Sequence, residues 1–159
     1  MEVKIMANTY TQVYIQIVFA VKGHQNLIQP KNKETLQKFI TGIVKNRGQK
    51  LLAIHSMPDH THLLVGLEPN ISISDLVRDV KPGSSKFINE SDWVKEKFNW
   101  QVGYGAFSYS RSQIDNVIKY INNQVEHHQK RTFQEEYIDF LNKFNVEFEE
   151  KYLFDWIEG

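Results

Sequence analysis

A chain of 159 residues is long enough to bury a hydrophobic core without disulfide bonds or structural metals, and we expect a single domain over residues 1–159. The composition, 41% hydrophobic and 24% charged, is ordinary for a globular protein, and the lack of cysteine excludes disulfides, thiolate metal sites and cysteine nucleophiles. Basic and acidic residues total 19 each, so any affinity for a polyanion must come from a local basic patch.

Membrane association is not expected from this sequence. No apolar run approaches the ~20 residues that a membrane span requires. The first ten residues also lack the charged-then-apolar order of a signal peptide. We therefore expect a cytoplasmic protein with no membrane partner.

The first third of the chain predicts a strand followed by a helix. Apolar residues alternate between residues 10 and 21, which is the period of a strand, while Tyr14 and Gln16 on its second face could meet a second subunit or a ligand. Apolar residues at three- and four-residue spacing then predict an amphipathic helix over residues 31–47, which Gly48 can end.

A hairpin and a second helix are predicted next. The short apolar strand 51–56 and the strand that begins near His60 are separated by a turn at 57–59, which favours an antiparallel pair. Helical spacing resumes over residues 71–80, with Ser72 or Ser74 as the N-cap. We expect Pro82-Gly83 to break or kink this helix, and residues 84–88 to form a further helical turn or two.

The last third predicts a loop, a strand and two helices. Residues 92–105 contain two tryptophans and two glycines and lead into a strand at 106–109. One helix is predicted from Ser112 to His127 or His128, and another over residues 132–144 with Thr132 and Glu135 as a capping box. The aromatic tail, from about residue 144 to 159, should pack on the domain or on a partner.

The order strand, helix, strand, strand, helix, strand is that of a ferredoxin-like split βαβ sandwich, an α+β fold. It predicts an antiparallel sheet with helices on one face, followed here by the C-terminal helices. The other face of the sheet would then be open for a site.

Two histidines lie two positions apart on the predicted strand near residue 60. Because side chains alternate along a strand, His60, His62 and Leu64 should share one face, which we expect to be the open one. Neutral imidazole is a common ligand of divalent metals, and a rigid strand holds two of them at a fixed separation. The same pair also fits ordinary surface or hydrogen-bonded histidines, so a metal site needs a third ligand from elsewhere.

The helix that begins near Ser112 carries polar residues beside its apolar face. Tyr120 and Gln124 share one flank at four-residue spacing, and His127 falls on that flank too. A lone tyrosine in such a position is commonly a packed ring with its hydroxyl in water. The residues that should form the buried face are Ile114, Val117, Ile118, Ile121 and Val125.

The strand segment PDHTHLLV and the helix segment YINNQ, which runs from Tyr120 to Gln124, together resemble the single-tyrosine HUH transposases of insertion sequences, the IS200-like family. The resemblance covers the chain from the first strand to the helix end near His128. It implies that Tyr120 is the nucleophile on the C-terminal helices, and that His60, His62 and Gln124 bind the metal. Because His127 falls on the same flank as Tyr120 and Gln124, we expect it as a possible neighbour of that site. Thr61 departs from the bulky hydrophobic residue usual between the two histidines, so packing beneath the site could be looser.

The resemblance also implies the activity. The protein would be a metal-dependent DNA transposase that cleaves and rejoins single-stranded DNA with hairpin ends through a 5′-phosphotyrosine link, using Mg²⁺ or Mn²⁺ and no nucleotide cofactor. The metal would polarise the scissile phosphate. Since the pKa of tyrosine is ~10, the metal or a bound water must help remove its proton. Cutting two ends with one tyrosine per chain implies a homodimer, joined edge to edge, and the first strand is our candidate for that interface.

Predicted DNA contacts are basic residues near the second helix and, less directly, elsewhere. The first set is Arg78, Lys81 and Lys86, which also fits a solvated helix face. The second set is Lys22, Lys45 and Arg47.

Two alternatives stay open at the level of sequence. One is a non-catalytic module that binds single-stranded nucleic acid, because ferredoxin-like sheets can present aromatic faces to bases. The other is a metal-dependent phosphodiesterase that uses water as the nucleophile. The fold alone does not separate these three functions.

Overall fold

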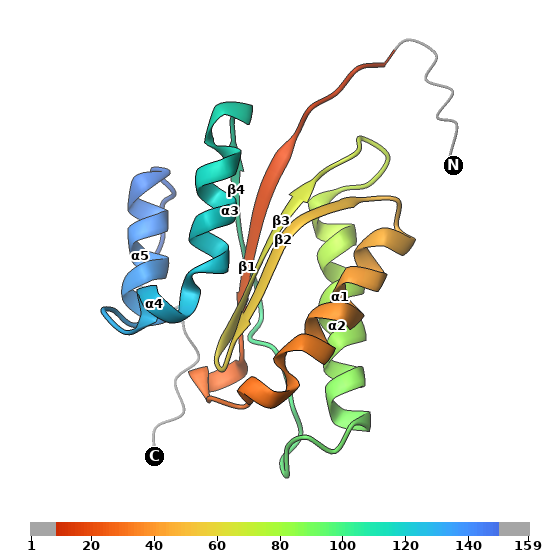
Figure 1. Cartoon of the computed structure of the whole chain (residues 1–159), viewed down its shortest axis with the longest axis vertical. Helices are drawn as coiled ribbons and strands as arrows, with labels where there is room; N and C mark the ends of the chain where they lie inside the picture. Colours follow the sequence, from red (N-terminus) through yellow and green to blue (C-terminus); the bar gives the residue numbers. More distant parts are fainter. Residues whose placement is uncertain (1–8, 150–159) are drawn as a thin grey trace.

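The computed structural model describes residues 9–149, which form one four-stranded sheet between two layers of helices (Figure 1). The elements in chain order are β1 (Tyr14–Ala20), the 3₁₀ turn η1 (Lys22–His24), α1 (Pro30–Asn46), β2 (Lys50–Met57), β3 (His60–Gly66), α2 (Ile73–Glu90), β4 (Gly105–Tyr109), the 3₁₀ turn η2 (Arg111–Gln113), α3 (Ile114–Asn122), α4 (Gln124–His128) and α5 (Phe133–Lys143).

The strand order is β2-β3-β1-β4, and all neighbouring strands are antiparallel. This order confirms the predicted ferredoxin-like sheet. β1 is a central strand that pairs with β3 on one side and with β4 on the other. The expectation that β1 joins the sheet of a second subunit at its edge is therefore wrong, because both of its hydrogen-bonding edges are already used. The outer strands are β2 and β4.

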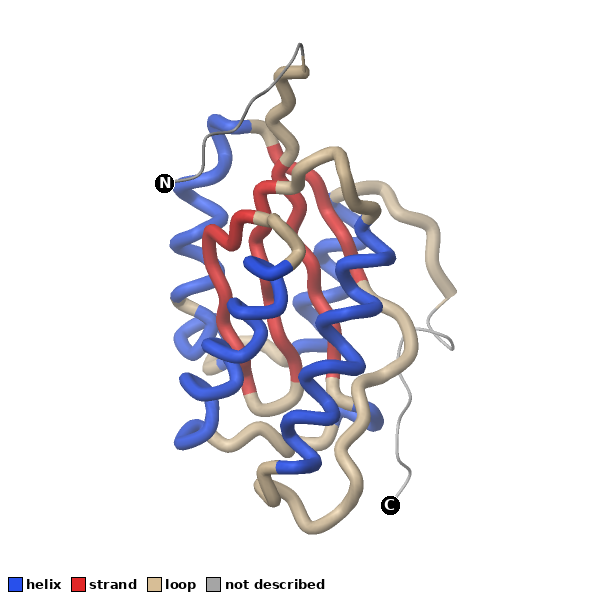
Figure 2. The backbone as a smooth tube through the Cα atoms, turned by 90° about the vertical axis from the view of Figure 1, so that its right-hand side faces the viewer, coloured by secondary structure: helices blue, strands red, loops and turns tan. Residues whose placement is uncertain are grey.

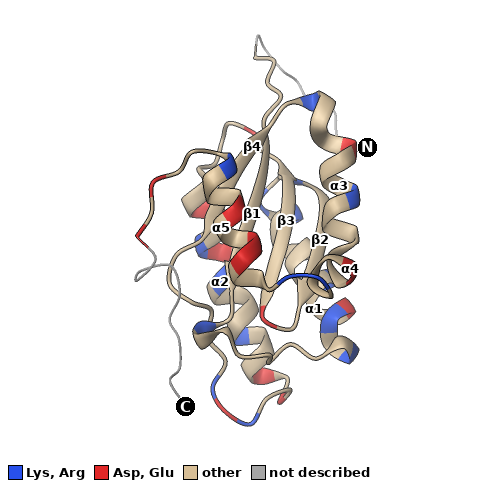
Figure 3. Ribbon diagram, turned by 90° about the vertical axis from the view of Figure 1, so that its left-hand side faces the viewer, with Lys and Arg blue, Asp and Glu red and all other residues tan. Residues whose placement is uncertain are grey.

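The two faces of the sheet are covered by different helices. α1 and α2 pack on one face, as predicted, and they stand in front of the sheet in Figure 2. α3, α4 and α5 lie on the other face (Figures 1 and 3). We expected this face to be open, but the three helices cover it. Val18, Ala20 and Leu64 give it an apolar surface on which these helices pack.

The main core lies between the sheet and the helices α1 and α2. Alternate residues of β1 and β3 point into it, and Thr61 points the same way, with its hydroxyl 3.0 Å from that of Ser56. This bond gives the buried threonine a polar partner and explains how it replaces a larger apolar residue between the two histidines. The residues of β1 and β3 in this core are Ile15, Ile17, Phe19, Leu63 and Val65, and Val21, directly after β1, joins them.

α2 continues through Pro82, where we expected a break. The missing proline N–H removes one helical hydrogen bond. Buried residues on both sides of the proline, Val77 and Val80 before it and Ser84 and Ile88 after it, keep the helix on the core. The Ser72 cap is confirmed, since its hydroxyl accepts a hydrogen bond from the N–H of Asp75.

The helix predicted from Ser112 to His127 or His128 is instead divided into η2, α3 and α4. Ser110 and Gln113 form a capping box at its N-terminus, so the helical segment begins before Ser112. The backbone leaves helical geometry at Asn123, which turns α4 relative to α3. Val125 is therefore exposed, although the unbroken helix placed it on the buried face.

At the start of α5, Thr132 and Glu135 form the predicted capping box. Most of the aromatic tail lies outside the described residues, so its packing stays a prediction. Within residues 9–149 none of the helices is both long and apolar enough to cross a bilayer.

Candidate active site

The two histidines of β3 are completely buried, at 0% exposure, on the face that α3, α4 and α5 cover. Each ring has a partner at Nδ1. Asp59 Oδ1 lies 2.6 Å from Nδ1 of His60, and the side-chain amide of Gln16 on β1 lies 2.9 Å from Nδ1 of His62. The Nε2 atoms of both rings point toward the C-terminal helices. For His60, whose Nδ1 faces a carboxylate, this is the arrangement of a metal-binding histidine. His62 gains the same arrangement when the Gln16 amide turns over so that its oxygen, and not its nitrogen, faces Nδ1.

α3 and α4 bring the other two predicted residues to these rings. Gln124 is fully buried, and its Oε1 atom lies 3.3 Å from Nε2 of His60. Tyr120 lies one turn earlier, and its ring stands edge-on to that of His62. The four residues predicted from sequence to form the metal site and the nucleophile therefore lie together in one chain.

Sequence reasoning missed the carboxylate at the centre of this cluster. Glu136, in the first turns of α5, is fully buried. Its Oε1 atom lies 3.1 Å from Nε2 of His62 and 3.2 Å from Nε2 of His128. The available signal was a charged residue in the apolar stripe of a helix, between Phe133 and Phe140.

The histidine pair after α3 is also divided differently from the prediction. His127, the expected neighbour of the site, stacks on the ring of Tyr120, with ring centroids 4.5 Å apart. His128 reaches the cluster itself, where its Nε2 atom lies 3.0 Å from Oε1 of Gln124.

The donor set fits a divalent cation. A carboxylate can only accept a hydrogen bond, so Asp59 places the His60 proton on Nδ1 and leaves a lone pair on Nε2. That lone pair faces the Gln124 carbonyl oxygen, itself an acceptor. Two ligands of one cation, each about 2.1 Å from it, lie about 3.0–3.4 Å apart. The observed contacts have this spacing, and one ligand atom from each of His60, His62 and Glu136 lies within 4.8 Å of the others.

Burial and hydrogen bonding control the ionisation of this cluster. Burial lowers the pKa of His60 although Asp59 opposes the shift, so the ring is held neutral, as a metal ligand must be. Burial alone would raise the pKa of Glu136, but hydrogen bonds from His128 and His62 and the charges of the histidines hold it well below its usual range. Glu136 is therefore ionised at neutral pH.

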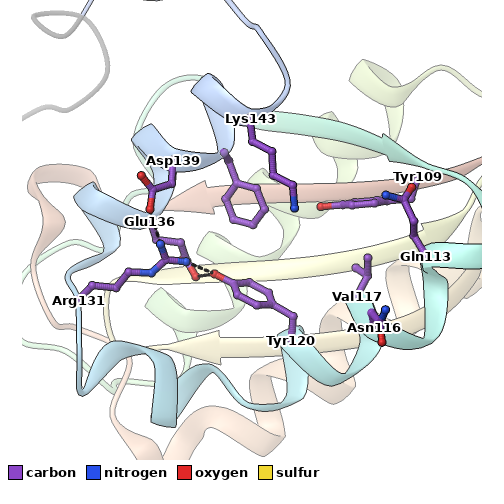
Figure 4. Close-up of a pocket in the computed structure, with 10 residues that line it drawn as sticks. Tyr109, Gln113, Asn116, Val117, Tyr120, Arg131, Glu136, Asp139 and Lys143 are labelled. Carbon is purple, nitrogen blue, oxygen red and sulfur yellow. Dashed lines mark hydrogen bonds and ion pairs between the residues drawn. The ribbon is translucent and has the colours of Figure 1, made fainter.

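The Tyr120 hydroxyl lies between an anion and a cation. It donates a hydrogen bond to Oε2 of Glu136, while Arg131 donates one to the phenolic oxygen at 3.1 Å (Figure 4). Burial, and then the charge of Glu136, raise the pKa of Tyr120 well above its ordinary value, and Arg131 only partly offsets them. This tyrosine is therefore a neutral phenol at neutral pH.

A half-open cavity of about 470 Å³ leads to this hydroxyl. Its walls come from β4, from η2 and α3, and from the loop before α5 with α5 itself (Figure 4). Aromatic rings, amide side chains and the cations of Arg131 and Lys143 line this cavity. The lining residues are Tyr109, Gln113, Asn116, Val117, Tyr120, Arg131, Glu136, Asp139, Phe140 and Lys143.

The basic residues predicted to contact DNA lie apart from this cavity. Arg78, Lys81 and Lys86 are on α2, in the opposite helical layer, and Lys81 donates hydrogen bonds to the carbonyls of Gln101 and Gly103. Lys45 and Arg47 lie at the end of α1, and Lys22 lies in η1. The cations that line the cavity are Arg131, on the loop between α4 and α5, and Lys143, on α5 (Figure 4).

A family model described as "Transposase IS200 like" matches residues 9–124. This chain belongs to the IS200-like transposase family. The family match covers β1 to β4 together with the helix that carries Tyr120, and it ends at Gln124. α5, which supplies Glu136, lies outside the matched segment.

One curated relative and two solved structures are similar to this chain. The ISDra2 transposase TnpA of Deinococcus radiodurans is 25% identical over 119 residues, which cover 71% of this chain and 84% of that protein. A crystal structure of a D. radiodurans R1 protein assigned as a transposase aligns over 77% of this chain and 98% of its own, with 22% identity and a TM-score of 0.61. A REP-associated tyrosine transposase bound to a REP hairpin aligns over 79% and 74%, with 15% identity and a TM-score of 0.57. The two structural matches support the fold.

Proposed function

We propose that this family member cleaves and rejoins single-stranded DNA, with Tyr120 as the nucleophile of a metal-dependent strand transfer. The observation that carries the proposal is the convergence of His60 and His62 from β3 with Tyr120 and Gln124 from α3 and α4 in one buried cluster. Each of these residue types suits its role, and a half-open cavity gives DNA access to the tyrosine.

His60, His62 and Gln124 are the residues that would hold Mg²⁺ or Mn²⁺. Imidazole nitrogens and an amide oxygen are suitable donors, and three protein ligands leave coordination positions for a phosphate. When bound, the cation supplies positive charge that polarises the scissile phosphate. Asp59 and Gln16 orient the two rings, so the protein fixes the ligand geometry before the cation arrives.

The covalent step uses the hydroxyl of Tyr120. Its oxygen attacks the scissile phosphorus, a new P–O bond to tyrosine forms, and the bond from phosphorus to the 3′-oxygen breaks. The phenol loses its proton to water as it attacks, and the departing 3′-oxygen takes up a proton, so the products are a 5′-phosphotyrosine and a free 3′-hydroxyl. Arg131 lies within hydrogen-bond distance of the phenolic oxygen and stabilises negative charge there. Attack by a 3′-hydroxyl reverses these changes and rejoins the strand.

The proposed substrate is single-stranded DNA with hairpin ends, as the hairpin-bound structural relative suggests. Arg131 and Lys143 line the cavity and would neutralise phosphates near the cut. The six basic residues predicted from sequence would contact more distant parts of the DNA. Because two ends must be cut and one chain holds one such tyrosine, we propose a homodimer, for which the outer strands β2 and β4 offer edges.

The test is formation of a covalent adduct. Single-stranded hairpins taken from the DNA that flanks the gene are incubated with the protein and Mn²⁺ and resolved on a denaturing gel. We expect a protein–DNA adduct from the wild type, none from Tyr120→Phe, and none when EDTA replaces Mn²⁺. Tyr137→Phe, which removes another hydroxyl from the same region, is the matched control.

The alternatives give different results in the same assay. A metal-dependent phosphodiesterase would cut the DNA without an adduct, and Tyr120→Phe would still cut. A non-catalytic binding module would retain the DNA in a native gel but would leave it intact in every variant. Either pattern overturns the proposed transposase activity.

A further inference from the structure

Glu136 connects the proposed metal ligands with the proposed nucleophile. Its two carboxylate oxygens face different groups. Oε1 lies 3.1 Å from Nε2 of His62 and 3.7 Å from Nε2 of His60, whereas Oε2 accepts the hydrogen bond from the Tyr120 hydroxyl. The Gln124 amide nitrogen, 3.3 Å from Oε2, holds the carboxylate from the side.

The burial of this carboxylate requires a compensating positive charge. Glu136 has 0% exposure, and an isolated buried carboxylate is strongly destabilising unless it is paired. The nearest guanidinium, on Arg131, binds Asp139 and the oxygen of Tyr120. His62 and His128 contact the carboxylate of Glu136. His60 contacts a second carboxylate, on Asp59. A divalent cation among the imidazoles would balance both negative charges.

The position of Oε1 matches that of a ligand. It lies among the same Nε2 atoms as the Gln124 oxygen, and both oxygens contact Nε2 of His128, at 3.2 and 3.0 Å. Four donor atoms, from β3, α4 and α5, therefore surround one position. The amide of Gln124 contributes no charge, so Glu136 is the only anionic donor in this described cluster.

We propose that Glu136 is a fourth protein ligand of the divalent cation and that its second oxygen positions the hydroxyl of Tyr120 beside that cation. The role of Glu136 in metal binding rests on the metal site proposed above but not on strand transfer, whereas its role in positioning Tyr120 rests on the whole proposed function. α5, which lies outside the segment that the family model matches, would then be part of the active site in this chain. Its first turns would join metal binding to placement of the nucleophile.

The proposed binding of the cation by Glu136 is tested by calorimetric titration of the EDTA-stripped full chain with Mn²⁺. Glu136→Gln keeps the size of the side chain and one oxygen but removes the charge, and we expect it to weaken Mn²⁺ binding at least about tenfold. Glu126→Gln makes the same change of charge at an exposed position of α4, and its affinity should stay within about twofold of wild type. Equal Mn²⁺ affinities of wild type and Glu136→Gln would overturn the proposal that Glu136 is a metal ligand.

Anomalous diffraction from wild-type crystals soaked in Mn²⁺ supplies a second measurement that does not depend on the folding of a variant. We expect a manganese peak within about 2.0–2.4 Å of Oε1 of Glu136. A manganese ion that is coordinated by the two histidines and Gln124 but lies far from Glu136 would also overturn the proposal that Glu136 is a metal ligand.

The proposed positioning of the Tyr120 hydroxyl by Glu136 is tested without DNA, by ¹⁹F NMR of protein labelled with 3-fluorotyrosine. The Tyr120 resonance is assigned from its loss in Tyr120→Phe. Mg²⁺ should shift this resonance in wild type, because a cation on one carboxylate oxygen weakens the hydrogen bond to the other. The shift should be lost in Glu136→Gln at saturating Mg²⁺. An unchanged shift in this variant would refute the proposal that Glu136 positions Tyr120. Failure of the adduct assay with these results intact would refute the proposed function alone.

Discussion

Replacing Gln16 with leucine should weaken metal binding although Gln16 touches no metal. The Gln16 amide lies between Nδ1 of His62, at 2.9 Å, and the Tyr109 hydroxyl, which donates to its oxygen at 2.7 Å. A metal on Nε2 of His62 requires a proton on Nδ1, and that proton needs an acceptor. The two ends of an amide can exchange, so metal binding should turn the Gln16 oxygen toward His62 and its nitrogen toward Tyr109.

The size of the effect follows from burial. His62 and Gln16 are both fully buried, so Gln16→Leu leaves Nδ1 of His62 without a hydrogen-bond partner or water. The loss of one such buried bond costs about 1–3 kcal/mol of unfolding free energy. Leucine has a similar volume, so little is added by a cavity. Loss of the group that orients a histidine ligand costs about 10–100-fold in metal affinity, or about 1.4–2.7 kcal/mol.

Two measurements test this prediction. Urea unfolding followed by tryptophan fluorescence gives the stability, and calorimetric titration with Mn²⁺ gives the affinity. Tyr109→Phe should have a smaller effect on both, because it leaves the amide in contact with His62. Gln129→Leu, at an exposed position after α4, should match wild type. The reasoning is refuted if Gln16→Leu binds Mn²⁺ as tightly as wild type while His62→Ala binds none.

Two further predictions concern Asp59 and His55. Asp59→Asn keeps an oxygen near Nδ1 of His60 but removes the charge that strengthens their bond, so Mn²⁺ affinity in the same titration should fall about tenfold; an unchanged affinity would show that Asp59 does not orient the ring. For His55, burial and then the charge of Lys33 lower the pKa from 6.5 to about 4. The unfolded chain therefore binds a proton between those pH values that the folded chain does not, and stability should fall as the pH drops through this range. Urea unfolding at pH 7 and pH 4.5 without metal measures this loss of unfolding free energy, and His55→Gln should make it smaller by about 1 kcal/mol, a value reduced because His55 is partly exposed. An identical loss in wild type and His55→Gln would contradict this prediction.

The sequence was sufficient where the pattern is local. Alternation along β3 placed His60 and His62 on one face and Leu63 and Val65 on the other, because a strand permits no other arrangement of neighbouring side chains. The short turn before His60 predicted the hairpin and, with the order of the elements, the ferredoxin-like sheet. Local bonds also gave the cap at Thr132.

The parts that could not be predicted depend on contacts between distant segments. Glu136 and His62 are 74 residues apart in the chain, and nothing in the sequence near either one requires them to meet. The break at Asn123 decides that His128 reaches the cluster and that His127 does not. Gln16 looked ambiguous for a similar reason, since a polar residue on a strand gains its meaning only from the ring across the sheet.

The alternation of β3 also explains how the site keeps its geometry. Each imidazole is next in the chain to a residue that is locked in the main core, such as Leu63, which lies between α1, α2 and the sheet. Displacement of His62 would therefore move Leu63 out of a close-packed interior, which is energetically costly. The free energy that holds the rings in place before a cation binds comes from apolar packing on the opposite side of the sheet. A site built in this way spends little of its metal-binding free energy on ordering its ligands, because folding has already ordered them.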